Sequence, residues 1–399
     1  MNMTEITTKE SPFSPGRPVP PEYFIARIKE IQRLERAIKQ TVSGRNENIF
    51  ITGPRGIGKS SLAGFALYLA GKHSLIGSHC ILGGVRSLEE MMGVVFRRLL
   101  QDCMDQKLFD KLKDVFKKYI KGISLFGMGI EFTENKSELR SLVDDFLPAM
   151  RKIYTESQDS GKRGLILILD DLNGITDVPQ FSQYIKSRVD ELAFSTHKFP
   201  LLLLLVGLPE RREDLVKHQP SVARIFDIID LHPMTNSESE DFFTSMFNRQ
   251  NITISSEALS LMVALSGGLP MLMHEVGDAV FWQDKDSHID EQDALSGIEQ
   301  AAQDVGRKYI EPQVSKLFKN KMYASILRKI HNKAPLGGTF DRQQILEALP
   351  SSERKNLDNF LQRSRKLGII EAWQSHGEYK FVNPLHQLYA WHEAQNRKD

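Results

Sequence analysis

A glycine-rich stretch, GPRGIGKSS, occupies residues 53–61 and fits the pattern G-x-x-x-x-G-K-[ST] without a mismatch. In such a loop the glycines let successive backbone N–H groups face one anion, and the following helix adds its N-terminal partial positive charge. Lys59 can reach the β- and γ-phosphates of a nucleotide, and the Ser60 hydroxyl is a hard oxygen ligand for Mg²⁺. The residues expected to bind ATP or ADP here are Gly53, Pro54, Arg55, Gly56, Ile57, Gly58, Lys59, Ser60 and Ser61.

A phosphate loop of this kind needs an acidic partner at the end of a neighbouring strand. The run LILILDD at residues 165–171 supplies two aspartates after five apolar residues. Asp170 is expected to hold Mg²⁺ through water, and Asp171 to orient or deprotonate the attacking water. The alternative is that two aspartates simply begin a polar loop. The lysine loop upstream favours the catalytic interpretation.

The elements that position these residues follow an α/β rhythm from about residue 21 to 235. Short apolar runs at 49–52, 79–85, 164–170 and 199–207 alternate with helical patterns. Continuous apolar runs separated by helices indicate parallel strands that are buried on both faces. Other local patterns predict a helix in 22–42 with Ile25, Ile28, Ile31, Leu34 and Ile38 on one face, a long helix over 88–120, a hairpin in 121–136 and a helix over 137–156.

The pattern changes twice after residue 235. Residues 237–307 read as several helices with a break at SGGLP, and residues 321–390 read as three short helices followed by a hairpin, the order of a winged helix. The fold class expected is an α/β P-loop NTPase core with a parallel sheet, a helical lid subdomain and a C-terminal winged-helix domain. The expected domains are an extended arm at 1–20, the ATPase core at 21–235, the lid at 236–310 and the winged helix at 321–399.

The composition excludes several kinds of site but does not indicate a binding partner. The chain has 399 residues, a net charge of +1 and two cysteines, so no disulfide framework, zinc site or overall basic surface is indicated. The N-terminus is polar, and the apolar runs are far shorter than the roughly 20 residues of a membrane helix. A cytoplasmic protein without a membrane partner is expected.

Taken together, four features in order resemble AAA+-type P-loop ATPases of the origin-recognition-complex-like and archaeal branch, which is close to the STAND ATPases. They are YFIARIKEIQRL at 23–34, the loop GPRGIGKSS, the strand LILILDD, and SGGLP at 266–270 before the C-terminal domain. The resemblance implies that Phe24, Ile25 and Arg27 lie against the adenine and that Pro270 contacts the nucleotide from the lid.

The chain departs from the pattern of that branch at several positions. Ala26 and Ile28 stand where the N-terminal box usually has Gly and Glu, and Asp171 stands where many hydrolysing relatives carry Glu. Met271 occupies the position of the lid arginine that senses the γ-phosphate. The strand LLLLLVGLPE lacks a polar sensor residue unless Glu210 serves. These departures leave the rate of hydrolysis open.

An arginine from a neighbouring subunit is a further catalytic candidate. In SVARIF, residues 221–226, Arg224 precedes an aromatic residue, as a trans-acting arginine finger does in related proteins. A surface salt bridge is the alternative role. Arg211 and Arg212 are weaker candidates for the same function.

The third helix expected in the C-terminal domain is rich in cations. They can contact DNA phosphates, with Trp373 and Lys380 of the hairpin touching a neighbouring groove. A solvated face or a surface for protein docking is the alternative. The cations concerned are Arg354, Lys355, Arg363, Arg365 and Lys366.

Three functions are compatible with these residues. The first, which we favour, is an Mg²⁺-dependent ATPase that couples ATP binding and hydrolysis to self-assembly or to action on DNA. The second is a nucleotide-gated signalling switch with slow or no turnover, whose winged helix contacts a partner protein. The third is a DNA-binding regulator in which the nucleotide is structural. A homo-oligomer or a partner protein is expected in either of the first two cases.

Overall fold

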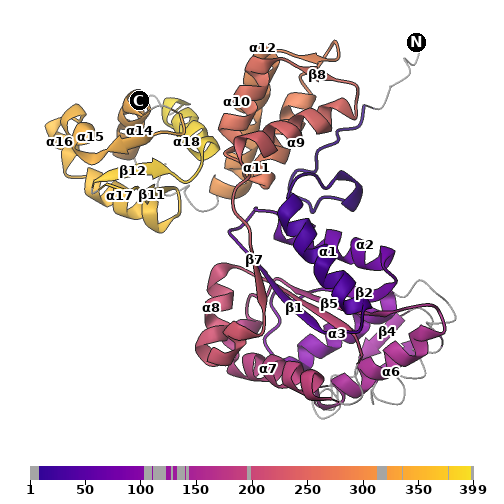
Figure 1. Ribbon diagram of the computed structural model, residues 1–399. Coiled ribbons are helices and arrows are strands. Elements are labelled where there is room, and N and C mark those ends of the chain that lie inside the picture. Colours follow the sequence, from indigo (N-terminus) through magenta and orange to yellow (C-terminus); the bar gives the residue numbers. More distant parts are fainter. Residues whose placement is uncertain are drawn as a thin grey trace. The chain divides into compact units, whose positions relative to one another are not determined.

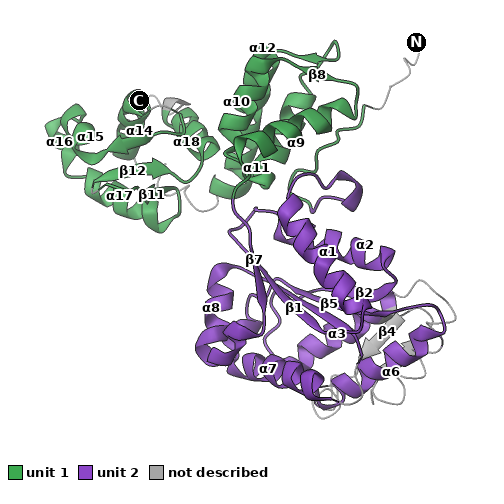
Figure 2. Cartoon of the chain, viewed as in Figure 1, with its two compact units in different colours: residues 1–17, 233–399 green, residues 18–232 purple. Residues whose placement is uncertain are grey.

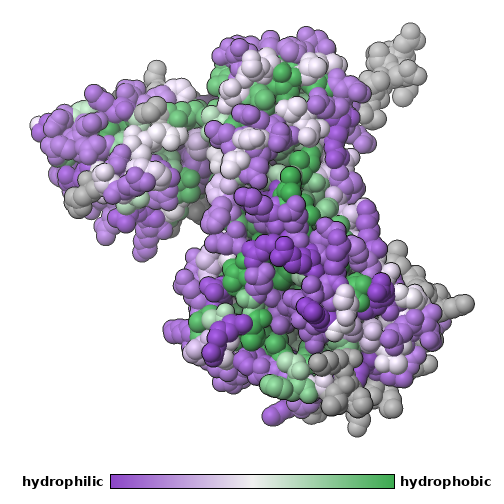
Figure 3. All heavy atoms as spheres, in the orientation of Figure 1, coloured by the Kyte–Doolittle hydropathy of each residue, from purple (hydrophilic) through white to green (hydrophobic). Residues whose placement is uncertain are grey.

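The computed structural model describes residues 9–102, 110, 123–126, 129–132, 140, 143–195, 199–311, 321–334, 336–375 and 377–396. The chain forms two compact units (Figures 1 and 2). One unit comprises residues 18–232, and the other comprises residues 233–399 together with residues 1–17. Hydrophilic side chains cover most of the face drawn in Figure 3. Among the described residues, no helix is long and apolar enough to cross a membrane.

The unit of residues 18–232 is built on a five-stranded parallel sheet in the order β2-β5-β6-β1-β7. Three of the expected apolar runs form β1, β5 and β6, and β5 and β6 are buried along their whole length. The run expected at 79–85 shares only residues 79–81 with β2, which begins at Leu75. The edge strand β7 was not expected, because its sequence DIID is short and has an aspartate at each end. The strands are β1 (Glu47–Thr52), β2 (Leu75–Ile81), β5 (Gly164–Asp170), β6 (Leu201–Val206) and β7 (Asp227–Asp230).

Helices cover both faces of this sheet. Alternate residues of a strand point to opposite faces, so Leu167 and Leu169 of β5 pack into the cluster with α3, α6 and α7. On the opposite face α2 contacts β5, where a Cβ at Gly77 would meet Ile166 and the α2 residue Leu67. The helices are α1 (Ile28–Val42), α2 (Lys59–Lys72), α3 (Leu88–Gln101), α6 (Phe146–Gln158), α7 (Pro179–Phe194) and α8 (Pro209–His218), with 3₁₀ turns at Pro21–Tyr23, Ile175–Asp177 and Pro220–Arg224.

Several boundaries differ from those expected. The helix α1 begins at Ile28, because Ala26 and Arg27 have left-handed φ angles of 66° and 63°. The prediction that Ile25 and Ile28 belong to its buried face is therefore wrong, and Ile28 is 68% exposed. The expected hairpin is confirmed as β3 (Ile123–Phe126) paired antiparallel with β4 (Gly129–Phe132).

The described parts of α3 and α6 are shorter than the helices expected there. The helix α3 ends at Gln101, and most of the rest of the expected helix over 88–120 lies outside the described residues. The helix expected over 137–156 is observed as α6, which begins at Phe146. Most of residues 137–142 also lie outside the described residues.

The second unit begins with four helices that carry clear start signals. Thr235 forms a capping box with Glu238, and Asp290 forms one with Asp293. The side chain of Ser255 caps the helix that begins at Ser256. A two-residue parallel pair, β8 (Thr253–Ile254) with β9 (His288–Ile289), was not expected. The helices are α9 (Asn236–Asn248), α10 (Ser256–Ser266), α11 (Pro270–Phe281) and α12 (Glu291–Val305), which continues into a π-helical turn at Gly306–Ile310.

The break at SGGLP has a backbone cause. Gly267 and Gly268 adopt left-handed φ angles of 59° and 67°, which end α10, and Pro270 opens α11. A Cβ at Gly268 would lie 2.2 Å from the carbonyl oxygen of Met234. Only glycine fits there.

The C-terminal elements surround a three-stranded antiparallel sheet in the order β10-β12-β11. The third helix of the C-terminal domain was expected to run without a break over residues 353–370. That prediction is wrong, because the chain forms two helices that are separated between Arg354 and Leu357. The strand β10 and the last helix were not expected. The elements are α14 (Lys321–Lys333), β10 (Thr339–Asp341), α15 (Arg342–Ala348), α16 (Ser351–Arg354), α17 (Leu357–Lys366), β11 (Ile370–Ala372), β12 (Glu378–Phe381) and α18 (Pro384–Asn396).

The N-terminal arm, described over residues 9–20, has no helix or strand and makes a turn at residues 15–17. Phe13 is 6% exposed and lies among the rings of Phe242, Phe243 and Phe247. Its ring occupies the space that a Cβ at Gly277 would fill, 2.2 Å from the phenyl Cε1. Phe13 is the buried aromatic anchor of the arm, and Lys9 adds an ion pair with Asp284 at 2.5 Å.

Candidate nucleotide site

The phosphate loop connects β1 to α2 through three glycines with positive φ. Gly53, Gly56 and Gly58 have φ angles of 145°, 76° and 94°, and Gly58 is the N-cap of α2. A Cβ at Gly53 would lie 2.7 Å from the carbonyl oxygen of Leu231. The glycines of the motif are thus required by the turn itself. The turn presents the N-terminus of a fourteen-residue helix to the pocket.

Lys59 folds back over this loop. Its Nζ donates to the carbonyl oxygens of Gly53 and Pro54, at 2.9 and 2.8 Å. Burial lowers the pKa of Lys59, while the nearby negative charges of Asp170, Asp171 and, more weakly, Glu210 oppose that shift. The ammonium therefore lies within electrostatic reach of the acidic pair.

The acidic pair lies where β5 ends. Asp170 is 4% exposed, and its Oδ1 accepts from the backbone N–H of Asp171 at 2.7 Å. Its Oδ2 lies 2.8 Å from Nε2 of His79. Asp171 has a left-handed φ of 55°, and its carboxylate accepts a hydrogen bond from the side-chain amide of Asn173. Both carboxylates are held by other parts of the protein.

The loop and the acidic pair line one pocket of about 580 Å³, although more than a hundred residues separate them in the sequence. Lys59, Ser60, Asp170 and Asp171 all contribute to its wall. The described residues contain no cluster of three acidic, histidine or cysteine ligands. Mg²⁺ ordinarily takes one or two protein ligands and completes its shell with water and phosphate oxygens. The Ser60 hydroxyl and the Asp170 carboxylate fit that requirement.

Comparisons with known proteins agree with this geometry. Residues 23–215 match the family model described as an AAA ATPase domain. Over these residues the chain is similar to AAA ATPase domains. A comparison with curated proteins gave no match.

Solved structures agree on the fold. The Walker-type ATPase PABY2304 of Pyrococcus abyssi is 16% identical, with a TM-score of 0.50 and coverage of 92% of this chain and 96% of that one. The ORC2 protein of Aeropyrum pernix, solved as ADPNP-ADP complexes, is 14% identical, with a TM-score of 0.54 and coverage of 93% and 94%. The expected resemblance to origin-recognition-complex-like AAA+ ATPases and the α/β P-loop fold class are confirmed.

The residues expected against the adenine do not line the pocket. Phe24 stacks on Phe65 of α2, with ring centroids 4.8 Å apart and planes inclined by 17°. Arg27 is 5% exposed, and its Nη2 donates to the carbonyl of Ile57 at 3.3 Å. Arg27 therefore supports the phosphate loop from behind. Ile25 is absent from the pocket wall, as are Phe24 and Arg27.

Pro270 and Arg224 are the two other residues expected at the site. Pro270 belongs to the other compact unit, where it begins α11. Arg224 ends the 3₁₀ turn after α8, is exposed, and does not line the pocket. No ion pair with Arg224 is recorded among the described residues. The weaker candidate Arg211 is engaged by Asp177 and Asp214, at 2.9 and 3.0 Å.

Four residues of the site were missed from the sequence. His79 and Asn173 contact the acidic pair, and Gly83 lies so close that its Cβ would be 2.4 Å from Oδ2 of Asp171. Val19 of the arm lines the pocket, and its N–H donates to Oγ of Ser61 at 3.2 Å. Of these residues, only His79 could have been suspected from the sequence, because it is a titratable residue within an apolar strand pattern.

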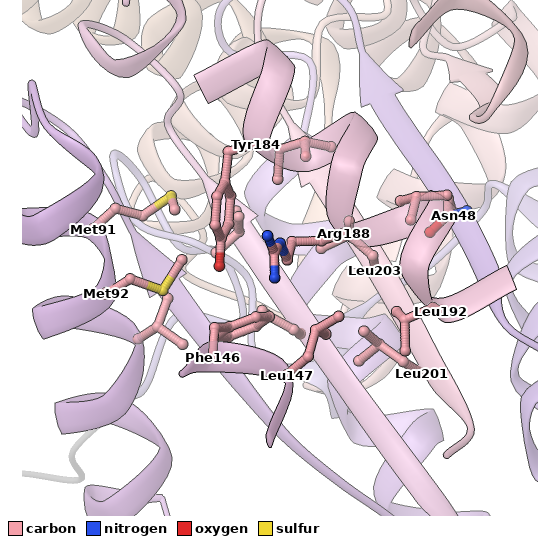
Figure 4. A pocket seen from close by; sticks show the side chains of 15 residues that line it. Asn48, Met91, Met92, Phe146, Leu147, Tyr184, Arg188, Leu192, Leu201 and Leu203 are labelled. Carbon is pink, nitrogen blue, oxygen red and sulfur yellow. The ribbon is translucent and has the colours of Figure 1, made fainter. Parts of the chain in front are cut away.

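A second cavity of the unit of residues 18–232 lies in the core between the sheet and α3, α6 and α7. Figure 4 shows Tyr184 and the guanidinium of Arg188 reaching into the space among Met91, Met92 and Phe146. Its volume of about 30 Å³ is enough for one or two water molecules. It is a packing defect and not a nucleotide site.

Proposed function

We propose that the chain binds ATP with Mg²⁺ and hydrolyses it, and that it couples this cycle to self-assembly or to action on DNA. The observation that carries the proposal is the shared pocket, in which Lys59 and Ser60 lie with Asp170 and Asp171. Lys59 would contact the β- and γ-phosphates, while Ser60 and Asp170 would hold Mg²⁺, which would neutralise charge on the phosphates. The nucleotide complexes of the ORC2 protein support ATP and ADP as ligands.

Asp171 is proposed as the residue that orients or deprotonates water. A positioned general base contributes about 10²–10⁴-fold to a rate. Arg224 is proposed as an arginine finger that acts on the site of a neighbouring copy, because it is exposed and does not line its own pocket. A homo-oligomer follows from that role. A cytoplasmic location belongs to the same proposal.

The test is Mg²⁺-dependent ATP hydrolysis by the full chain. We expect Lys59→Ala to lose nucleotide affinity, and Asp171→Asn to retain ATP binding while turnover falls by about 10²-fold or more. Lys217→Ala, a change on the α8 surface, serves as the control and should match the wild type. Turnover at the wild-type level in Asp171→Asn would contradict the role of that carboxylate. Arg224→Ala should lower turnover only at concentrations where the protein assembles.

The second candidate is a nucleotide-gated switch with slow turnover. One observation favours it: the Asp171 carboxylate is engaged by Asn173 and lies against Gly83, which restrains its approach to water. Under this alternative, nucleotide copurifies, gel filtration shifts with ATP, and turnover is negligible. Asn173→Ala should then raise turnover. If Asn173→Ala lowers turnover instead, Asn173 supports the base and the hydrolase is favoured.

We propose that residues 236–310 act as a lid and that residues 321–399 form a winged helix which contacts DNA or a partner protein. On α17 the side chains of Arg363, Arg365 and Lys366 are exposed. In the hairpin, by contrast, Lys380 pairs with Glu371 at 3.1 Å and lies 3.6 Å from the ring centroid of Trp373. The α17 surface is therefore the better candidate for phosphate contacts.

A DNA-binding assay also distinguishes the proposed ATPase from a DNA-binding regulator in which the nucleotide is structural. DNA affinity measured in a salt titration should fall steeply with salt, and it should fall uniformly across sequences in Arg365→Ala. Absence of DNA binding at low ionic strength would leave protein docking as the role of the surface. DNA binding that is independent of added nucleotide, with no turnover, would favour the regulator.

A further inference from the structure

His79 lies beside the acidic pair because of the register of two neighbouring strands. In the pairing of β2 with β5, His79 lies opposite Ile168 and Ile81 lies opposite Asp170. Residues two apart on a strand point to the same face, so His79 and Asp170 share one face of the sheet. The imidazole reaches diagonally to the carboxylate, and Nε2 and Oδ2 lie 2.8 Å apart. His79 also lines the nucleotide pocket.

We propose that His79 is a positioning residue that fixes the Asp170 carboxylate for the metal. This inference rests on the proposed function, because it concerns the same site. Oδ1 of Asp170 receives the N–H of Asp171, and Oδ2 receives Nε2–H of His79. Two donors on different oxygens fix the plane of a carboxylate. With its plane fixed, Asp170 presents the same lone pairs toward the pocket before and after ligand binding.

The hydrogen bond from His79 leaves capacity for a metal-bound water. A carboxylate has about four acceptor sites, and the two protein donors use two of them. Asp170 can therefore keep both donors and still accept a hydrogen bond from a water molecule in the shell of Mg²⁺. Residues that orient a metal-binding carboxylate in this way typically change metal affinity by 10–100-fold when they are removed. His79 does not touch the nucleotide in this role.

A purely structural role makes a different prediction. Asp170 is 4% exposed, and a buried carboxylate that loses a partner destabilises the protein whether or not metal binds. A structural residue would therefore change folding stability and nucleotide affinity together. A positioning residue would change metal affinity while nucleotide affinity in the absence of metal stays constant.

The experiment compares His79→Leu, which removes the donor, with His79→Gln, which keeps an N–H at a similar reach. Mn²⁺ serves as the probe, and electron paramagnetic resonance measures free Mn²⁺ in the presence of full-length protein and a non-hydrolysable ATP analogue. Calorimetry with the same analogue in EDTA gives nucleotide affinity without metal. His232→Leu, a change at a histidine whose side chain is 77% exposed, is the control.

We expect His79→Leu to weaken Mn²⁺ binding by about tenfold or more, with nucleotide affinity in EDTA within twofold of the wild type. His79→Gln should restore Mn²⁺ affinity. The proposal is overturned if His79→Leu binds Mn²⁺ as the wild type does, or if metal and metal-free affinities fall in parallel. Absence of turnover in the wild type would contradict the ATPase proposal alone, because Mn²⁺ binding is measured without turnover.

Discussion

Lowering the pH should destabilise the unit that contains residues 233–399 through two histidines, of which His274 is buried and His386 is partly buried. Burial lowers the pKa of His274 to about 4, and burial does the same to His386. His274 is 4% exposed, and its Nδ1 accepts the backbone N–H of Ser14 at 3.1 Å. The neighbouring Glu275 is engaged by Lys308 at 2.8 Å and is not available to stabilise an imidazolium.

The sign and size of the effect follow from linkage. A histidine in the unfolded chain has a pKa of about 6.5, so between pH 6.5 and 4 the unfolded state binds more protons than the folded state. Stability is then unaffected by these groups above pH 6.5 and is lost as the pH falls below it. For a shift from 6.5 to about 4, each histidine removes about 2 kcal/mol by pH 5 and about 3 kcal/mol by pH 4 at 25 °C.

Urea unfolding at pH 7.5, 6.0 and 5.0 measures this loss. His274→Asn keeps an acceptor near the position of Nδ1 but cannot titrate in this range, so it should lose about half of the pH dependence even if its stability at pH 7.5 is lower. His232→Asn, at an exposed histidine, should keep all of it. An unfolding free energy that is flat from pH 7.5 to 5.0, or a slope unchanged in His274→Asn, would refute the argument.

Three other substitutions test separate features. Ala26→Gly should raise the free energy of unfolding by about 1 kcal/mol, because Ala26 has a φ of 66°, a conformation that costs a non-glycine residue about 1–2 kcal/mol; chemical denaturation measures it, and a loss of stability would contradict it. Phe13→Ala should lower the same quantity by about 3 kcal/mol, whereas the nearby exposed change Glu10→Ala should not. Gly83→Ala should displace the Asp171 carboxylate, which its Cβ would approach to 2.4 Å, so that turnover falls while ATP affinity does not; unchanged turnover would contradict a role for the present position of Asp171.

The sequence predicted those parts of the fold in which local pattern and burial agree. The run 164–170 forms β5 with the bounds expected, because a strand buried on both faces is apolar throughout. The loop over 53–60 was equally readable, since its glycines are required by backbone geometry and its lysine by chemistry. Periodicity failed where the backbone departs from the helix, as at Ala26 and Arg27, whose left-handed conformations no apolar pattern reveals.

The residues that support the site could not be predicted, because they depend on strand register and on contacts between distant segments. His79 contacts Asp170 only because β2 pairs with β5 in one register. Phe13 packs against helices more than two hundred residues away. In a polar N-terminal segment, a single phenylalanine carries no local signal of such a contact. Arg27, expected at the adenine, donates to the carbonyl of Ile57, a contact between segments thirty residues apart in the sequence.

Lys59 and Asp171, which would face a nucleotide, both have partners within the protein. Lys59 donates to the carbonyls of Gly53 and Pro54, and the Asp171 carboxylate accepts from Asn173. A bound phosphate must replace the first pair of hydrogen bonds, and catalysis must in addition release Asp171 toward water. Binding and hydrolysis therefore require different rearrangements of the same pocket. A hydrolase and a switch both require the rearrangement of Lys59 that admits a phosphate. The strength of the contact between Asn173 and Asp171 decides whether Asp171 is then released toward water.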